Sequence, residues 1–209
     1  MTATRFALAA ALLAAPAAAT AQEALYDPAP PKDSAFVRFV DAGRTGAAGT
    51  LAGGEMDVSG DGVSDFVVVP AGTHEAALGE TAGSVSLEAG HYYTVVFNEA
   101  GAAGPEVIRD DVLTNPAKAG LHFYNLSGED GLSLTAPKQN VAIFEDVGAG
   151  EMKFRPVGAV DVDLAVVSAG GTVADVGSVR LERRAAKSVM VMASAGGLTA
   201  VVVDNTVDR

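Results

Sequence analysis

Short runs rich in valine, phenylalanine and tyrosine recur along this chain at a spacing of about 8 to 12 residues, which is typical of strands and turns. Glycine, aspartate, asparagine or proline separates the runs, and helical patterns are nearly absent after residue 21. Examples are AFVRFV at 35–40, YYTVVF at 92–97, LHFYNL at 121–126 and SVMVMA at 188–193. The pattern predicts an all-β fold of antiparallel strands.

One run shows how such a strand meets solvent. Val160, Val162 and Leu164 alternate with Asp161 and Asp163. Because successive side chains of a strand point to opposite faces, one face of this segment is apolar and the other is polar. We therefore expect a strand with one buried face and one solvent-exposed face.

The first 21 residues predict a cleaved secretory signal. Arg5 is followed by a run of small and apolar residues and then by Ala19-Thr20-Ala21, the small-x-small pattern of a cleavage site. No later segment approaches the roughly 18 continuous apolar residues of a membrane span. We expect an exported protein without membrane insertion.

The charge of the chain excludes several classes of partner. Removal of residues 1–21 takes one arginine and no acid, which changes the net charge from −12 to −13. A surface this acidic repels nucleic acid and anionic lipid, so neither is an expected partner. The chain has no cysteine, which rules out thiol catalysis and cysteine-ligated metal.

The two halves of the chain resemble each other. AFVRFVDAG at 35–43 aligns with AGLHFYNLS at 119–127, and VSLEAGHYYTVV at 85–96 aligns without gaps with VRLERRAAKSVM at 179–190. A repeat that keeps its order predicts duplication of one unit. We expect two tandem antiparallel β-sandwich domains, at 22–110 and 111–209, joined within the glycine- and proline-rich stretch 99–118.

The stretch DVSGDGVSDFVVV at 57–69 has the spacing of a calcium-binding loop. Calcium takes six to eight oxygen ligands, and alternate positions of a tight loop can direct them at one centre. The candidate ligands are Asp57, Ser59, Asp61, Asp65 and the carbonyl of Val63, with Gly62 at the turn. Val68 stands where an EF-hand places its bidentate glutamate, so we favour a polar hairpin turn that leads into a strand at Phe66–Val69.

Catalytic signatures are missing from the sequence. His74, His91 and His122 are far apart along the chain, and no Gly-x-Ser-x-Gly occurs. The acid pairs Asp110/Asp111 and Asp161/Asp163 are typical of solvated loops and strands, and the chain has no tryptophan to line a sugar cleft. We assign no catalytic, metal-ligating or cofactor-binding residue and expect a protein that is not an enzyme.

Two further segments suggest contacts with partners. RLERRAAK at 180–187 is the basic cluster of the chain, which we interpret as a solvated hairpin, with docking to an acidic partner as the alternative. The proline-rich leader ALYDPAPPKDS at 24–34 carries Leu25 and Tyr26 as isolated apolar residues. It is either a terminal linker or a strap that binds a partner.

Four stretches together resemble a known family. They are ALYDPAPPKDSAFVRFVDAG at 24–43, SDFVVVPAGTHEAAL at 64–78, LEAGHYYTVV at 87–96 and FYNLSG at 123–128. In this order they are similar to the AlgF family of periplasmic alginate O-acetylation proteins, and the leader followed by SAFVR is the most specific part. The loop at Asp57–Gly62 is not part of that family's pattern.

The resemblance implies a periplasmic protein of two small β-sandwich domains. Such a protein works with a membrane-bound O-acyltransferase and SGNH-type periplasmic acetyltransferases that acetylate mannuronate residues, and it serves as an adaptor. The family has no established catalytic residues to transfer. Similar accessory proteins accompany acetylation of cellulose, so the polymer stays open.

The leading hypothesis is thus a non-catalytic adaptor that binds O-acetyltransferase components, with the exopolysaccharide itself as a further candidate partner. Leu25, Tyr26 and exposed sheet edges are its expected contact surfaces. The alternatives are a calcium-stabilised extracellular β-sandwich for adhesion or polysaccharide binding, and an acetylesterase or transferase.

Overall fold

The computed structural model describes residues 29–58, 60–98 and 104–207. The chain divides at Pro30 into two units, and the strands of the described residues lie in the second unit, Pro31–Arg209. The predicted signal at 1–21 and the leader residues Leu25 and Tyr26 lie outside the described residues. The described part of the chain contains no helix with the length and hydropathy that a membrane span requires.

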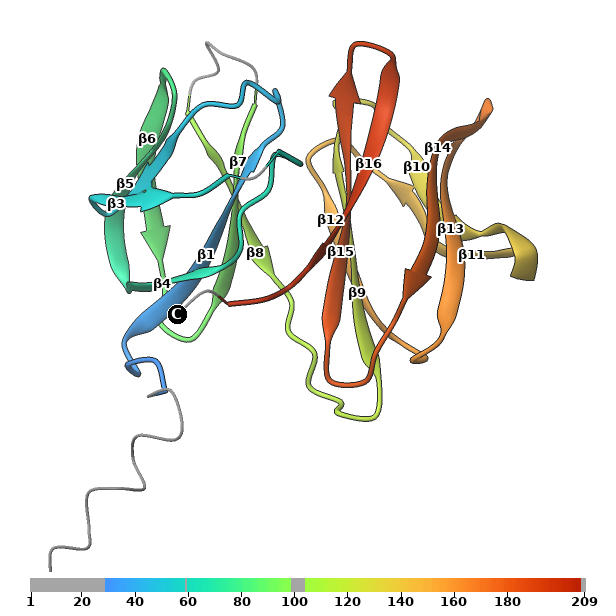
Figure 1. Ribbon diagram of the computed structural model, residues 1–209, viewed down its shortest axis with the longest axis horizontal. Helices are drawn as coiled ribbons and strands as arrows, with labels where there is room; N and C mark the ends of the chain where they lie inside the picture. Colours follow the sequence, from blue (N-terminus) through green and yellow to red (C-terminus); the bar gives the residue numbers. More distant parts are fainter. Residues whose placement is uncertain (1–28, 59, 99–103, 208–209) are drawn as a thin grey trace, which may run out of the picture. The chain divides into compact units, whose positions relative to one another are not determined.

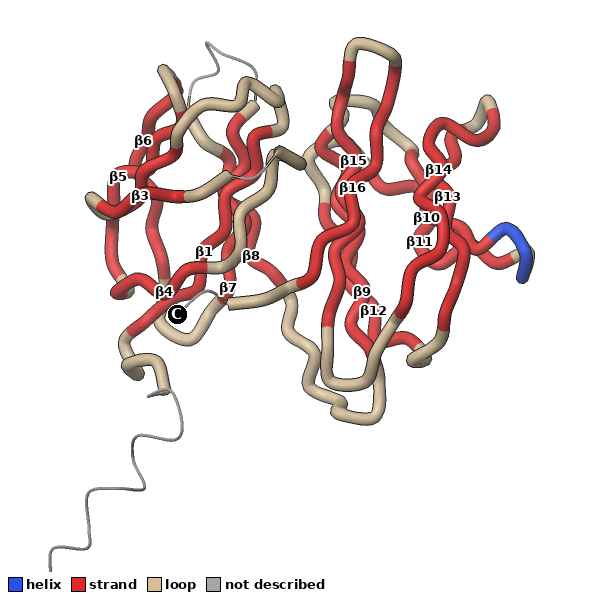
Figure 2. Tube along the Cα trace, in the orientation of Figure 1, coloured by secondary structure: helices blue, strands red, loops and turns tan. Residues whose placement is uncertain are grey.

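Within the described residues, eight strands form the first sandwich (Figures 1 and 2). One sheet has the order β4-β1-β7-β8 and the other has the order β3-β2-β5-β6. The strands are β1 (Ser34–Asp41), β2 (Gly49–Leu51), β3 (Gly54–Met56), β4 (Val67–Pro70), β5 (Gly72–Leu78), β6 (Thr81–Leu87), β7 (Tyr92–Phe97) and β8 (Glu106–Asp110).

The second sandwich has eight strands and one short 3-10 turn, η2 (Pro137–Gln139). Its sheets have the orders β12-β9-β15-β16 and β11-β10-β13-β14. The strands are β9 (Ala119–Leu126), β10 (Leu132–Ala136), β11 (Val141–Val147), β12 (Met152–Val157), β13 (Asp161–Ser168), β14 (Gly171–Arg180), β15 (Ala186–Ser194) and β16 (Gly197–Asp204).

Strand order confirms the internal repeat. Adding eight to each strand number of the first sandwich gives the order of the second. The pairing register agrees with the sequence alignment, because Phe36 pairs with Tyr92 and the aligned residues Gly120 and Ala186 also pair. The predicted all-β fold with two tandem sandwiches is therefore confirmed.

Two strand pairs differ from the antiparallel expectation. β1 pairs with β7 in parallel, and β9 pairs with β15 in parallel, whereas the other pairs between strands of the described residues are antiparallel. In each sandwich the chain leaves the first strand, enters the opposite sheet twice, and then returns beside the first strand in the same direction. Hydrophobic alternation marks a strand but not the direction of its neighbour, so the sequence pattern could not reveal this pairing.

The segment predicted as the join contains a strand. β8, with the sequence EVIRD, pairs antiparallel with β7 and so belongs to the first sandwich. Residues 111–118 then connect β8 to β9. The mixed polar composition of β8 hid it, because an edge strand with one neighbour need not be apolar.

Within the part of the chain that the structure describes, three apolar clusters hold the sheets together. Alternation along β1 sends Val37 and Phe39 into the core of the first sandwich, and the same alternation along β9 sends Leu121 and Phe123 into the core of the second. The third cluster joins the outer faces of the β1 and β9 sheets. Its buried members are Val40, Ala42, Val63, Val96, Tyr124, Leu126, Met190 and Met192.

Candidate functional site

Arg38 lies on the outer face of β1 and is only 1% exposed. Its Nε donates to Thr94 Oγ1 at 2.8 Å on the neighbouring strand β7. Its other nitrogens donate to the second sandwich, to the Tyr124 hydroxyl at 2.7 Å, Ser188 Oγ at 3.0 Å and Asn205 Oδ1 at 3.0 Å. One guanidinium therefore bonds to both sandwiches, which suits its fixed fork of donors.

Asp110, at the end of β8, supplies the compensating charge. Its Oδ2 lies 3.7 Å from an Arg38 nitrogen and accepts a hydrogen bond of 2.7 Å from Thr94 Oγ1. The guanidinium also lies over the rings of Phe66 and Tyr124, at 4.6 and 5.1 Å from their centroids. These contacts offset the cost of burying a cation.

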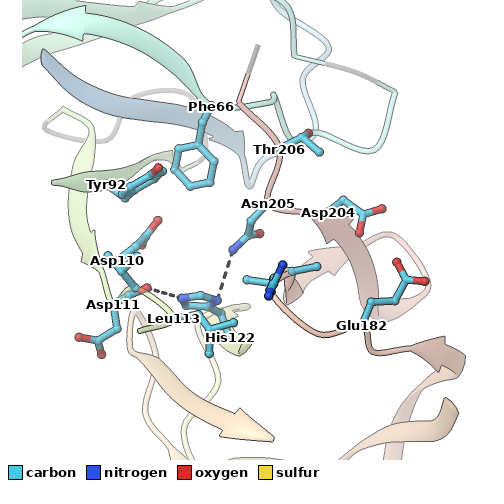
Figure 3. A pocket seen from close by; sticks show the side chains of 14 residues that line it. Phe66, Tyr92, Asp110, Asp111, Leu113, His122, Glu182, Asp204, Asn205 and Thr206 are labelled. Carbon is cyan, nitrogen blue, oxygen red and sulfur yellow. Dashed lines mark hydrogen bonds between the residues drawn. The ribbon is translucent and has the colours of Figure 1, made fainter. Parts of the chain in front are cut away.

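His122 occupies the neighbouring position on β9 and is 2% exposed. Its Nε2 lies 2.8 Å from the carbonyl oxygen of Asp111, which can only accept, so Nε2 carries the proton. Nδ1 then accepts from Asn205 Nδ2 at 3.3 Å, and Figure 3 marks both bonds. Burial lowers the pKa of His122, so the ring is neutral at neutral pH.

Tyr124 and Ser188 complete this group, and both are fully buried. Burial raises the pKa of Tyr124, so its hydroxyl keeps its proton at all ordinary pH values. Ser188 Oγ accepts from Arg38 and donates to Asn205 Oδ1 at 2.8 Å. We refer to these side chains as the Arg38 cluster, which comprises Arg38, Thr94, Asp110, His122, Tyr124, Ser188 and Asn205.

Six members of the cluster form two triads that occupy equivalent positions in the two sandwiches. The repeat places His122 where the first sandwich has Arg38, and Ser188 where it has Thr94. Asp110 pairs with Tyr92, and Asn205 bonds through its backbone N–H to the carbonyl of Ala186, the residue equivalent to Tyr92. Arg-Thr-Asp in the first sandwich thus faces His-Ser-Asn in the second.

A cavity of about 550 Å³ opens beside this cluster, and we call it the Asp110 cavity. Phe66 and Tyr92, which meet edge to face at 5.2 Å, form an aromatic wall. Figure 3 shows these rings near Asp110, with His122 and Asn205 across the space. Arg184 and Glu182, from the turn between β14 and β15, also line it.

The polar groups of the cluster are engaged with one another, which limits the chemistry they can perform. Ser188 directs its proton to Asn205, and the two ring nitrogens of His122 bond to Asp111 and Asn205. A serine nucleophile needs a base that accepts its hydroxyl proton, and these bonds do not form such a pair. The arrangement favours fixing two sandwiches in one orientation.

The three histidines that the sequence singled out lie in different surroundings. His74 is partly exposed and its Nε2 bonds to the Pro70 carbonyl at 2.8 Å. His91 lies at the surface beside Arg109 and Glu88. His122 lies in β9 and belongs to the Arg38 cluster, a buried position that its place in the sequence did not indicate.

The two acid pairs also differ. Asp110 is buried in the cluster, whereas Asp111 is exposed and lines the cavity. Asp161 is exposed on β13, and Asp163 pairs with Lys138. That salt bridge lowers the pKa of Asp163 and raises the pKa of Lys138.

The Asp57 loop runs from the end of β3 to the start of β4 and is fastened mainly by its second half. The Gly62 carbonyl accepts from the Asp41 N–H at 2.8 Å, and Ser64 Oγ accepts from the Phe39 N–H at 2.8 Å. Asp65 accepts from the hydroxyl of Thr206. Phe66, the first residue of the predicted strand, forms an isolated bridge with Val207, and β4 itself begins at Val67.

The candidate calcium ligands do not converge in the described chain. Among residues 29–58, 60–98 and 104–207, no group of three histidine, aspartate or glutamate side chains is placed to hold a metal ion. Asp57, Asp61 and Asp65 are exposed, and Ser59 lies outside the described residues. Val63 instead pairs with Val40 and packs into the third apolar cluster.

The basic cluster at 180–187 forms the turn between β14 and β15. Arg180 is exposed, and its Nε lies 3.0 Å from Glu182. Lys187 pairs with Asp204. Arg184 lines the Asp110 cavity, a position that its sequence neighbours did not reveal.

Sequence reasoning missed the centre of the site. Arg38 lies within a run of apolar residues that predicts only a strand. Thr94, Tyr124 and Asn205 belong to no recognised motif. A signal was present in the repeat, which aligns Arg38 with His122 and so places two basic residue types at equivalent positions. Arg38 and His122 lie on the outer faces of β1 and β9, the first strands of the two sandwiches.

Known proteins resemble the chain over nearly its full length. A family model described as "Alginate O-acetyl transferase AlgF" matches residues 7–188. The alginate biosynthesis protein AlgF of Pseudomonas aeruginosa is 34% identical over 98% of this chain and 94% of its own length. The protein of the same name from Azotobacter vinelandii is 31% identical over 88% of this chain and 84% of its own length.

Solved structures of the separate AlgF domains from P. aeruginosa also match. The C-terminal domain aligns at 31% identity, covering 42% of this chain and 98% of its own, with a TM-score of 0.38. The N-terminal domain aligns at 27% identity, covering 40% of this chain and 100% of its own, with a TM-score of 0.34. Because the family model and the relatives in alginate biosynthesis span almost the entire sequence, the chain belongs to the AlgF family.

Proposed function

We propose that this protein is a non-catalytic periplasmic adaptor for O-acetylation of alginate or a related exopolysaccharide. It brings the membrane-bound and periplasmic acetyltransferase components together and so raises their local concentration. Its relatives are named for alginate biosynthesis and its family model for alginate O-acetylation, which supports the process. The predicted export signal supports the compartment.

The Arg38 cluster is the observation that carries the adaptor role. A buried arginine that bonds to Tyr124, Ser188 and Asn205 contributes orientation more than stability, because an apolar contact of the same volume would hold two sandwiches as strongly. An adaptor needs its two binding surfaces at a fixed angle. We infer that the cluster sets this angle.

Exposed sheet edges are the surfaces that we expect partners to use. β4 and β8 are the edges of one sheet of the first sandwich, and β12 and β16 are the edges of its counterpart in the second. An edge strand presents unpaired backbone groups that an extended segment of a partner can bond. The leader with Leu25 and Tyr26 is a further contact segment.

The direct test mixes the purified mature protein with the matching acetyltransferases. We expect co-elution in gel filtration and a measurable heat of binding, together with acetylation of the polymer that falls when the protein is omitted. Absence of both co-elution and binding heat would remove the adaptor role. Alginate and cellulose oligomers, compared as acetyl acceptors, would identify the polymer.

A second assay separates an adaptor from an enzyme. The purified protein alone should not turn over an acetyl ester above the rate of a buffer control. If turnover were present, and if Ser188→Ala or His122→Gln abolished it while the fold was kept, the protein would be an acetylesterase or transferase.

A further inference from the structure

The Asp110 cavity has an acidic lining. Of the described residues that line it, Arg184 alone carries a positive charge, because His122 is held neutral by its burial. The carboxylates that line it are Asp110, Asp111, Glu182 and Asp204. An excess of carboxylates in a concave site attracts cations and repels anions.

A second cavity continues the acidic surface. It has a volume of about 510 Å³ and shares Asp204 and Thr206 with the Asp110 cavity. It adds the carboxylates of Glu55, Asp57 and Asp65 and has no basic residue in its described lining. The two cavities therefore present a continuous acidic surface on both sides of the segment 204–206.

Asp110 is already paired with the buried Arg38, whereas the ion pairs of two other lining carboxylates lie at the surface. Glu182 pairs with Arg180, and Asp204 pairs with Lys187, but the side chains of Glu182 and Asp204 remain 58% and 62% exposed. Exposed pairs of this kind are weak and exchange readily with solvent ions or with other partners. A bound cation can therefore share these two carboxylates.

An unpaired oxygen atom of Asp110 is a second observation, separate from the acidic lining, that favours a ligand in this cavity. The residue is 7% exposed, and its Oδ1 has no hydrogen-bond partner in the described structure, although Oδ2 is bonded. Buried polar atoms are nearly always bonded, so an unpaired one calls for a missing donor. Asp110 lines the cavity, so a donor bound there lies beside this residue (Figure 3), and a shift of neighbouring side chains would bring it to Oδ1, which has almost no accessible surface.

Apolar groups of the cavity fit the stem of a long side chain. Tyr92 and Leu113 line it, and Val112 is 50% exposed there. Long basic side chains lay their methylene stems along apolar surface and place the charged end at a polar site. A guanidinium has several donors in one plane and pairs with carboxylates in a bidentate way, which a lysine ammonium cannot do.

We propose that the Asp110 cavity is the docking site for an arginine side chain that a protein partner of the acetylation machinery presents on an exposed segment. The proposal rests on the adaptor function proposed above and names the surface through which it acts. The flanking acidic cavity would receive further basic residues of the same segment.

A small probe tests the site without any partner. Argininamide is titrated into the mature protein while backbone amide resonances are followed by NMR. We expect saturable shifts at Asp111, Ala186 and Asn205, with much smaller shifts from citrullinamide, which has the same shape without the charge. Equal binding of both probes, or binding of acetate or glucuronate in place of argininamide, would overturn the proposal.

Variants tie the probe to the carboxylates. The double variant Asp111→Asn/Glu182→Gln keeps the side-chain shapes and should weaken argininamide binding about tenfold, which corresponds to about 1.4 kcal/mol. The control Asp161→Asn/Glu80→Gln removes the same charge from exposed residues that do not line the cavity and should bind as the wild type does. Equal losses of affinity in both variants would mean that the net charge of the protein, and not the cavity, governs argininamide binding.

The same variants separate this proposal from the adaptor function. If the wild-type protein binds an acetyltransferase and Asp111→Asn/Glu182→Gln binds it equally well, the cavity is not the docking site and the adaptor function stands. If the wild type binds no acetyltransferase but binds argininamide with the expected selectivity, the adaptor function fails and the arginine site stands.

Discussion

At the scale of single residues, Arg38 connects the two sandwiches through a buried side chain. Its donors reach Thr94 in its own sandwich and Tyr124, Ser188 and Asn205 in the other. A buried cation is tolerated because a carboxylate and several acceptors surround it, and removal of any of these leaves a charge without compensation.

Arg38→Met should therefore destabilise the protein strongly. The substitution keeps the length of the side chain but leaves Asp110 buried without its cation, which typically costs about 3–5 kcal/mol. Urea unfolding followed by circular dichroism measures the loss. Arg109→Met is the matched control, since it breaks only exposed contacts, with Glu88 and His91, for which we expect about 0–1 kcal/mol.

The double variant Arg38→Met/Asp110→Asn identifies the cause. It removes both buried charges, so we expect it to be more stable than Arg38→Met alone. A double variant that is less stable than the single one would mean that packing, and not the charge pair, governs the loss.

The lowered pKa of His122 predicts how the free energy of unfolding depends on pH. Its folded pKa lies below the ordinary value of 6.5 because burial disfavours the charged ring. Above pH 6.5 the full contribution of the neutral ring is present. As the pH falls from there toward the folded pKa, the unfolded chain binds a proton that the folded protein excludes, and stability falls by at most about 1.4 kcal/mol per pH unit.

Urea unfolding at about pH 7.5 and about pH 5.5 brackets this range. The decrease between the two pH values should be smaller in His122→Gln, whose amide can still donate to the Asp111 carbonyl. His74→Gln, at a partly exposed position, should keep the wild-type decrease. The same decrease in all three proteins would assign it to carboxylates instead.

At the scale of elements, periodicity predicted most strands but not their neighbours. Runs such as 92–97 and 121–126 became β7 and β9, because burial of one face demands alternation. β2 and β3 have three residues each, too few to show a period, and β8 is polar. The Arg38 cluster draws on β1, β7, β8, β9, β15 and the end of β16, so no local pattern could assemble it.

The loop before β4 gives an element-scale prediction. In the described residues its carboxylates do not form a group that could hold a metal, and its second half is fastened by Gly62, Ser64 and Asp65. We expect the melting temperature to be the same in millimolar calcium and in chelator. A calcium-dependent rise that disappears in Asp61→Ala would support the calcium-stabilised alternative.

At the scale of the whole molecule, two sandwiches of one topology share a third apolar cluster. Val40 and Val96 come from the first sandwich, and Tyr124 and Met190 come from the second. The division into domains at residues 110 and 111 stays a prediction. A cluster on outer faces can open while the two inner cores remain intact, because their residues are separate.

Val40→Asp in the intact chain should disrupt the packing of the third apolar cluster between the two sandwiches. A charge in the third cluster has no partner there, so it disfavours the closed arrangement. Hydrogen exchange should be faster at the Phe66 N–H, which donates to the Thr206 carbonyl that follows the second sandwich, while the amides paired within the sheets stay protected. Val141→Asp, at a residue that is 50% exposed, should exchange as the wild type does. Loss of protection throughout Val40→Asp would mean that the sandwiches cannot fold apart.

The facing triads have a consequence for symmetry. Two identical copies of the first sandwich, packed through these same faces, would bring two Arg38 guanidinium groups together, and like charges in a buried contact repel. A symmetric pair could therefore not keep this arrangement. Covalent linkage of the two copies allows one face to carry arginine and aspartate and the other to carry neutral histidine and asparagine. The tandem chain can hold a polar asymmetric junction that a homodimer could not.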